Sequence, residues 1–176
     1  MVDKKYYRDV SVDVLGAIIS AVIIAVLFFI TSDFVFKPPN LHGKWYAISI
    51  TDQSEHTQYI GMKLVYEVII FQEVNSLNGT AEKRSETIDG KEYFYEYANR
   101  VKSKLKGYID RNYFSKDKLH IQWIEKGRKR ESSSYFNITR FNDNYMYGTF
   151  SSTISSSNGR IEWVRDLNDA KELYNK

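Results

Sequence analysis

The sequence contains no cysteine, so disulfides, zinc–thiolate sites and cysteine nucleophiles are all excluded. Proline is nearly absent as well, with two residues that are adjacent, Pro38 and Pro39. The three histidines, His42, His56 and His120, do not have the spacing of a metal-binding motif. The sequence also lacks the glycine-containing motifs of phosphate-binding loops and of nucleophile elbows. The sequence therefore predicts no enzyme, no metal site and no cofactor.

A strong excess of one charge is also lacking. The 25 lysines and arginines stand against 22 acidic residues, which leaves a net charge of +3. A protein that binds a nucleic-acid polymer needs a denser basic stripe, so we predict no such partner, while a small anionic ligand is compatible with this charge. Aromatic residues are frequent, with 14 tyrosines and 10 phenylalanines; they favour strands and can stack on nucleobases.

One long apolar run lies near the N-terminus. Val14–Ile30 is 17 residues without a charged side chain, and at 1.5 Å per residue it spans about 25 Å, close to the hydrocarbon thickness of a bilayer. Lys4, Lys5 and Arg8 resemble the basic start of a signal peptide, but no typical cleavage site follows the run. We therefore predict that residues 1–36 form an N-terminal tail and an uncleaved transmembrane anchor.

Small residues recur along this run at a spacing of four, at Ala17, Ala21 and Ala25. Such a spacing lets helices approach closely in lipid, so we predict self-association. Three basic residues precede the run, while Lys37 and Lys44 follow it. By the positive-inside rule this slight difference favours a cytoplasmic N-terminus, with the rest of the chain outside the inner membrane.

After a short linker at 37–40, the apolar pattern in 41–176 changes to an alternation of period two, which indicates strands. The expected strands are 43–51, 58–74, 80–88, 91–98, 103–111, 118–125, 130–141, 145–153 and 160–165. Turn signals occur at Asn78-Gly79, Asp89-Gly90, Lys126-Gly127 and Asn158-Gly159. Residues 166–174 are expected to form a short terminal helix.

Short connections with no room for a crossover helix predict antiparallel neighbours. Closing such a sheet removes its exposed edges. We therefore predict an all-β ligand-binding domain at 41–176, an up-and-down antiparallel barrel of about eight strands like that of lipocalins. A sandwich of two sheets is the alternative.

Side-chain alternation then suggests a ligand site. Arg111, Arg140 and Arg165 have the inward parity of three alternate strands and lie near their ends, so all three are expected at one mouth of the barrel. Guanidinium groups suit phosphate oxygens, and the inward Trp123 can stack on a base. These four residues are the predicted ligand site. Alternatively, each arginine covers a tryptophan or pairs with a carboxylate.

Several segments carry a resemblance to a known family: LHGKWY, GYIDRNYFSKDKLHIQWIEKGRKRESS, MYGTFSST and GRIEWVR. With the anchor and the proline-containing linker, they resemble the membrane-anchored β-barrel effectors of bacterial CBASS antiphage systems, across about 41–165. The resemblance implies that the barrel binds a cyclic dinucleotide made by a partner nucleotidyltransferase. The protein then forms a homo-oligomer in the inner membrane and disrupts it, and the infected cell dies. Family members have paired transmembrane segments, whereas this sequence has one.

A messenger made in the cytoplasm requires a cytoplasmic barrel, so we expect a single-pass inner-membrane protein with that orientation, against the slight charge preference. The triplet Gly43-Lys44-Trp45 is also similar to the G-x-W of lipocalins, whose tryptophan closes one barrel end. An alternative is therefore an anchored lipocalin-like carrier of a small apolar ligand outside the inner membrane. A third possibility is a tethered interaction module with a filled barrel.

Overall fold

The computed structural model describes residues 4–35, 39–112, 115–127, 130–140 and 142–175. The chain divides into two units, Met1–Lys37 and Pro38–Lys176, which are described separately. The predicted linker 37–40 lies partly outside the described residues, since Lys37 and Pro38 are not among them.

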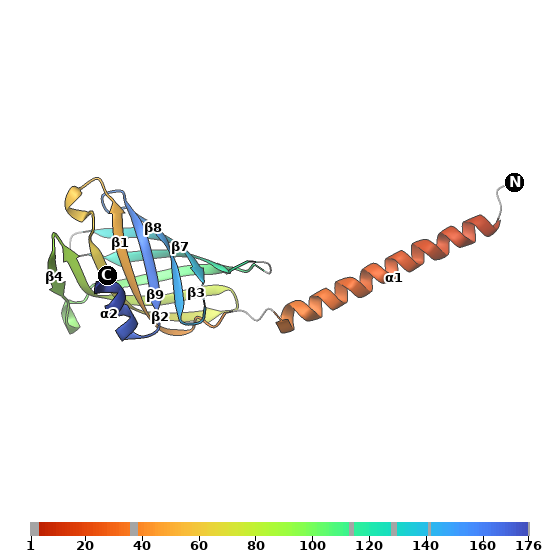
Figure 1. Cartoon of the computed structure of the whole chain (residues 1–176), viewed down its shortest axis with the longest axis horizontal. Coiled ribbons are helices and arrows are strands. Elements are labelled where there is room, and N and C mark those ends of the chain that lie inside the picture. The colour runs from red at the N-terminus through yellow and green to blue at the C-terminus, as the bar shows by residue number, and fades with distance from the viewer. Residues whose placement is uncertain (1–3, 36–38, 113–114, 128–129, 141, 176) are drawn as a thin grey trace. The chain divides into compact units, whose positions relative to one another are not determined.

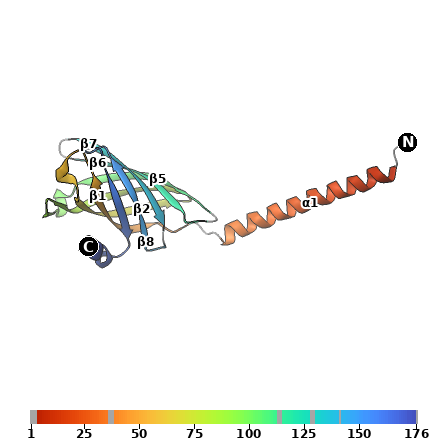
Figure 2. The ribbon, with the colours of Figure 1, turned by 45° about the horizontal axis from the view of Figure 1, so that its top comes forward.

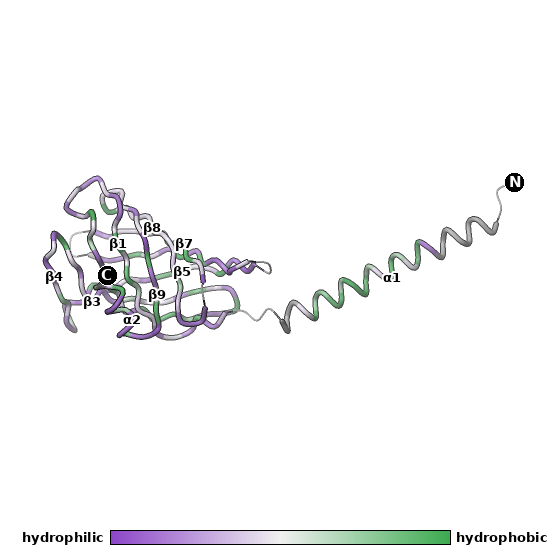
Figure 3. Tube along the Cα trace, viewed as in Figure 1, coloured by the Kyte–Doolittle hydropathy of each residue, from purple (hydrophilic) through white to green (hydrophobic). Residues whose placement is uncertain are grey.

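The first unit is one helix, α1 (Lys4–Val35). Within it, the 19 residues Asp13–Thr31 have a mean hydropathy of 2.9, and this segment is long and apolar enough to cross a membrane. Figure 3 shows much of this run in green, the colour of hydrophobic residues. A helix with apolar side chains all around it has no polar face for water, which is consistent with an anchor in lipid.

The second unit is a closed barrel of eight antiparallel strands, as predicted, and the sandwich alternative is not formed (Figures 1 and 2). The strands are β1 (Gly43–Gln53), β2 (Lys63–Glu73), β3 (Ser76–Ile88), β5 (Lys102–Asp110), β6 (Lys118–Lys126), β7 (Glu131–Arg140), β8 (Tyr145–Ser152) and β9 (Ser157–Val164). Each pairs with the next in this order, and β9 pairs with β1.

A further strand, β4 (Lys91–Phe94), pairs with the last four residues of β3 and extends the sheet beside the barrel. Two short 3-10 helices, η1 (Thr57–Tyr59) and η2 (Tyr97–Asn99), lie in the connections. The turn signal at Asp89-Gly90 is confirmed, because these residues join β3 to β4 and both have a positive φ, 49° and 71°.

Two of the predicted turns lie inside strands instead. Asn78-Gly79 belongs to β3 and Asn158-Gly159 to β9. The chain reverses a few residues earlier in each case, at Val74 with φ 53° and at Ser155 with φ 52°. A Cβ at Gly79 would clash with the backbone oxygen of Ile69 on β2, so glycine serves a close approach of two strands there rather than a turn.

The helix α2 (Leu167–Asn175) packs on the outside of the barrel, against β1 and β9 (Figure 1). It covers an outer apolar cluster that includes Tyr46, Ile48, Val65 and Val164. These residues have the outward parity of their strands and would otherwise face water. The helix therefore explains why β1 is buried on both faces along most of its length.

One end of the barrel, where β1 begins and β9 finishes, is filled by side chains; we call it the closed end. Trp45 is fully buried there, and its indole N–H donates a hydrogen bond of 2.9 Å to the backbone oxygen of Leu41. The guanidinium of Arg165 lies over the Trp45 ring, 4.0 Å from its centroid. Arg165 also donates to three backbone oxygens of the segment that enters the barrel, those of Asn40, His42 and Lys44.

We expect Arg165→Ala to lower the free energy of unfolding by about 2–3 kcal/mol, because it removes charge-assisted hydrogen bonds and a cation–π contact. The measurement is urea unfolding of the full chain in detergent, followed by tryptophan fluorescence. Arg160→Ala is the control: Arg160 is exposed and pairs with Asp52 at 3.2 Å, an interaction worth at most about 1 kcal/mol. Equal losses in the two variants would contradict this role for Arg165.

Candidate ligand-binding cavity

The opposite end of the barrel, where β1, β3, β6 and β8 finish, contains a cavity of about 260 Å³. We call it the open end. Side chains from β1, β2, β3, β6, β7, β8 and β9 line the cavity. Because these strands point their inward side chains at the same space, residues far apart in the sequence form one site.

The inner part of the cavity is aromatic. Trp123 on β6 is only 3 % exposed, and its ring centroid lies 4.9 Å from that of Tyr66 and 5.4 Å from that of Phe136. Phe150 continues this surface at 6.0 Å from Phe136. These rings are tilted by 37–69° to one another, so they form an aromatic lining against which an aromatic ring of a ligand can pack.

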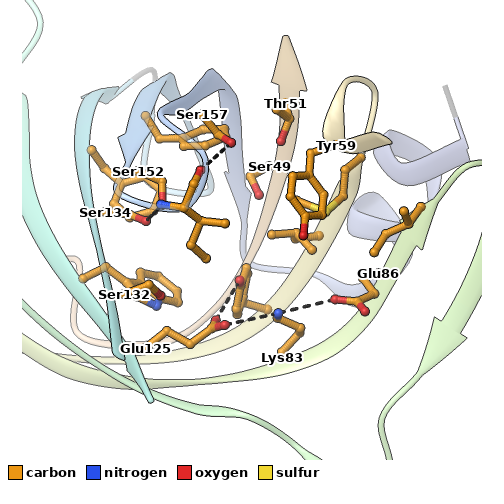
Figure 4. A pocket seen from close by; sticks show the side chains of 18 residues that line it. Ser49, Thr51, Tyr59, Lys83, Glu86, Glu125, Ser132, Ser134, Ser152 and Ser157 are labelled. Atoms are coloured by element: carbon orange, nitrogen blue, oxygen red, sulfur yellow. Dashed lines mark hydrogen bonds and ion pairs between the residues drawn. The ribbon is translucent and has the colours of Figure 1, made fainter. Parts of the chain in front are cut away.

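Hydroxyl groups line one wall (Figure 4). Ser134 and Ser152 are hydrogen-bonded to each other at 2.9 Å. In contrast, Ser49, Thr51 and Ser132 are more than nine-tenths buried, and within the described part of the chain no hydrogen bond engages their hydroxyls. Among the described residues, the fully buried side-chain atoms without a partner are Ser103 Oγ and Trp163 Nε1. The hydroxyls of Ser49, Thr51 and Ser132 are not among them; these residues line the cavity, so their hydroxyls are available to a ligand.

Charged groups also line the cavity: Lys83 and Glu86 come from β3, and Glu125 on β6 lies beside Ser132 of β7. The Lys83 ammonium lies between two carboxylates, 3.2 Å from Glu125 and 3.4 Å from Glu86 (Figure 4). The hydroxyl of Tyr66 donates to Glu125 at 2.9 Å, and that of Tyr95 donates to Glu86 at 2.6 Å. All three charged side chains are mostly buried, with 12–16 % of their surface exposed.

The environment of Tyr66 keeps its phenol neutral. Burial, and next the charge of Glu125 that accepts its hydrogen bond, raise the pKa of Tyr66 well above its usual value. Neutral Tyr66 is thus a fixed donor that holds one oxygen of the Glu125 carboxylate. The carboxylate is positioned by two groups, this phenol and the Lys83 ammonium.

The predicted site residues are divided between the two ends of the barrel. Trp123 lines the cavity. Arg111, Arg140 and Arg165 lie together at one end, as expected from the strand directions, but this is the closed end. Arg111 pairs with Asp117 at 3.8 Å and Arg140 with Asp143 at 3.4 Å.

Arg165 covers Trp45, which is the alternative that the sequence left open for the arginines. Its partly buried position lowers the pKa of the guanidinium from the usual value, because desolvation disfavours the charged form. None of the three arginines lines the cavity. Binding of phosphate by the arginines stays a prediction.

Sequence reasoning did not single out the charged groups of the cavity. Glu125 could have been found, because it lies two residues after Trp123 and shares its inward parity. Lys83 and Glu86 could not both have been found, because strict alternation places them on opposite faces of β3. A shift in the β2–β3 register between them turns both side chains inward.

Comparisons of this chain with protein-family models, with curated proteins and with solved structures find no match. The fold and the site alone therefore define the class: a closed antiparallel β-barrel with a cavity lined by aromatic, hydroxyl and charged side chains, on a chain with a helix apolar enough to cross a membrane.

We expect the stability of the barrel to fall as pH rises above about 10, the pKa of an unfolded tyrosine. Tyr66 stays protonated in the fold at such pH but ionises on unfolding, so the unfolded state binds fewer protons and gains stability. Tyr66→Phe should make this fall smaller, measured by urea unfolding between pH 8 and about 11. Tyr108→Phe, at an exposed tyrosine, is the control; equal slopes in both variants would contradict the role of Tyr66.

Proposed function

We propose that the protein is a membrane-anchored receptor whose barrel takes a cyclic dinucleotide into the cavity at its open end. In this proposal it acts in antiphage defence, as its resemblance to CBASS effectors implies. The observation that carries the proposal is the cavity itself, which combines an aromatic surface with unengaged hydroxyls and buried charges. Most binding cavities are largely apolar with a few polar groups that orient the ligand.

The anchor supplies the second half of the mechanism. A ligand shifts a monomer–oligomer equilibrium only by its difference in affinity for the two states. Binding at the barrel would favour a self-associated form in which the α1 segments Asp13–Thr31 contact one another in the bilayer. Concentrating these helices would disrupt the inner membrane and kill the infected cell.

In this proposal the chain crosses the bacterial inner membrane once, with the barrel in the cytoplasm. The messenger is made there and, as a doubly charged molecule, does not cross a bilayer unaided. The three basic residues before α1's apolar segment then lie outside, against the slight charge preference of the sequence.

The alternative, a carrier of a small apolar ligand, is favoured by one observation: Trp123, Phe136 and Phe150 offer an apolar surface. The rest of the cavity disfavours it. An apolar ligand would lie against Lys83 and two glutamates and would leave buried hydroxyls without partners, which costs free energy. A panel with both kinds of ligand separates the two proposals.

Calorimetry of the full chain in lipid nanodiscs against cyclic dinucleotides of all base combinations, with a fatty acid as apolar probe, tests the proposal. We expect at least one cyclic dinucleotide to bind. Trp123→Ala should weaken it by roughly 5- to 150-fold, the loss of one base–aromatic stack. Absence of binding by a folded barrel would sink the proposal, and binding of the fatty acid alone would favour the carrier.

Arg111→Ala and Arg140→Ala belong in the same measurement, because they test the predicted arginine site. If phosphates bind at the closed end, these variants weaken binding and reduce its dependence on salt. If the ligand occupies the open end, both variants retain the affinity of the unaltered protein.

Self-association is tested in the anchor. Replacing Ala17, Ala21 and Ala25 with leucine should reduce ligand-induced oligomers in cross-linking of membranes, because bulkier side chains separate the helices. The matched control, Ile19→Leu with Ile23→Leu and Val26→Leu, changes three residues of similar size on the same helix. Unchanged cross-linking in the alanine variant would reject the small-residue contact.

A further inference from the structure

We infer that a guanine base of the ligand enters the cavity, while the phosphates stay outside it; this inference rests on the proposed function. It assigns the buried Lys83–Glu125 pair, which no part of the predicted site contained, as the group that reads the base. The inference follows from the charge, the hydrogen-bond pattern and the size of the cavity.

Charge excludes phosphate from the interior. The cavity is lined by one lysine and two glutamates, a formal charge of −1, and Lys83 is already in contact with both carboxylates. A phosphate in contact with Lys83 would be brought close to Glu86 and Glu125. Like charges at such distances repel strongly in a partly buried site.

The hydrogen-bond pattern matches one base. Lys83 and Glu125 present an ammonium donor beside a carboxylate that accepts, 3.2 Å apart. Guanine presents the complementary order along its pairing edge: the O6 acceptor, then the N1–H and N2–H donors. The carboxylate requires two adjacent donors. Adenine has an acceptor, N1, at one of these positions. Uracil has a single donor, N3–H, which lies between two acceptors.

The Glu125 carboxylate has capacity for these two bonds. Each carboxylate offers about four lone-pair sites, and Tyr66 and Lys83 each engage one oxygen. The phenol and the ammonium hold the carboxylate in one orientation before the ligand arrives. Such preorganisation reduces the entropy lost on binding.

Size and shape agree with a single base. A cavity of about 260 Å³ is just below the range of about 300–1,000 Å³ for drug-sized ligands, so it accommodates one planar ring system but not a whole cyclic dinucleotide. Trp123 lies in the inner part to stack on the ring. The unengaged hydroxyls of Ser49, Thr51 and Ser132 are available to polar atoms of the base edge or the ribose.

The test is calorimetry of the full chain in nanodiscs with three cyclic dinucleotides that differ only in their bases: cyclic di-guanylate, cyclic di-inosinate and cyclic di-adenylate. Hypoxanthine lacks only the 2-amino group of guanine. We expect cyclic di-guanylate to bind at least about tenfold tighter than cyclic di-inosinate, the contribution of one good base contact. This comparison needs no altered protein.

Protein variants then locate the contact. Glu125→Gln should abolish the preference for guanine over hypoxanthine, while Glu73→Gln, the same change at an exposed glutamate that does not line the cavity, leaves it intact. Circular dichroism and the melting temperature establish that both variants fold. If Glu125→Gln does not fold, Lys83→Met takes its place. It removes the donor for O6, which guanine and hypoxanthine share and adenine lacks, so it should weaken cyclic di-guanylate and cyclic di-inosinate about equally and leave cyclic di-adenylate unaffected.

The outcomes separate this inference from the proposed function. Binding of cyclic dinucleotides without a preference for guanine, or a loss of that preference in Glu73→Gln equal to that in Glu125→Gln, overturns the inference and leaves the receptor proposal standing. If no cyclic dinucleotide of any base composition binds the folded chain, the receptor proposal itself fails.

Discussion

The pairing of β1 with β9 is the interaction on which the rest of the barrel depends. It joins residues more than 100 positions apart, such as Ala47 with Trp163 and Ser49 with Ile161, and it converts an open sheet into a closed one without edges. It also brings the end of β9 beside the start of β1, which is where Arg165 meets Trp45. The closed end, the hydroxyls of β1 in the cavity and the surface under α2 all follow from this one closure.

Closure leaves the barrel with two chemically different halves. Near the closed end the interior is filled with apolar side chains, among them Leu41, Trp45, Leu119 and Ile138, all at most 1 % exposed. Toward the open end the inward positions hold serine, threonine, lysine and glutamate as well as aromatic side chains such as Trp123 and Phe150. Burying charges costs stability even when they are paired, so this half is not arranged for the most stable core, and the proposed polar ligand would account for the charges.

Much of the barrel could be predicted because alternation and short connections leave few other arrangements. The strands at 43–51, 103–111, 118–125 and 145–153 were expected within two residues of their observed bounds. Trp123 was placed inward by the same alternation. The Asn-Gly pairs at 78–79 and 158–159 were wrongly predicted to be turns. Glycine occurs both in turns and where two strands approach closely, and a single sequence does not distinguish these two reasons for a glycine.

The site itself was only partly predictable. Alternation says which side chains face inward but not which end of the barrel is filled, since that depends on how Leu41 and Arg165 pack around Trp45. The shift in register between β2 and β3 turns both Lys83 and Glu86 toward the interior, although strict alternation allows only one of them. Such a shift depends on long-range pairing and leaves no local signal.

The blocked end has a consequence for how the proposed membrane disruption would occur. Leu41, Trp45 and Arg165 obstruct the lumen at the end where the chain enters the barrel, so the lumen is a blind recess and not a conduit. Ions would not flow through it, and a porin-like route across the membrane is excluded for this domain. Under the proposed function, a leak would run between or around assembled α1 segments, with ligand sensing in the barrel and permeation in the helices.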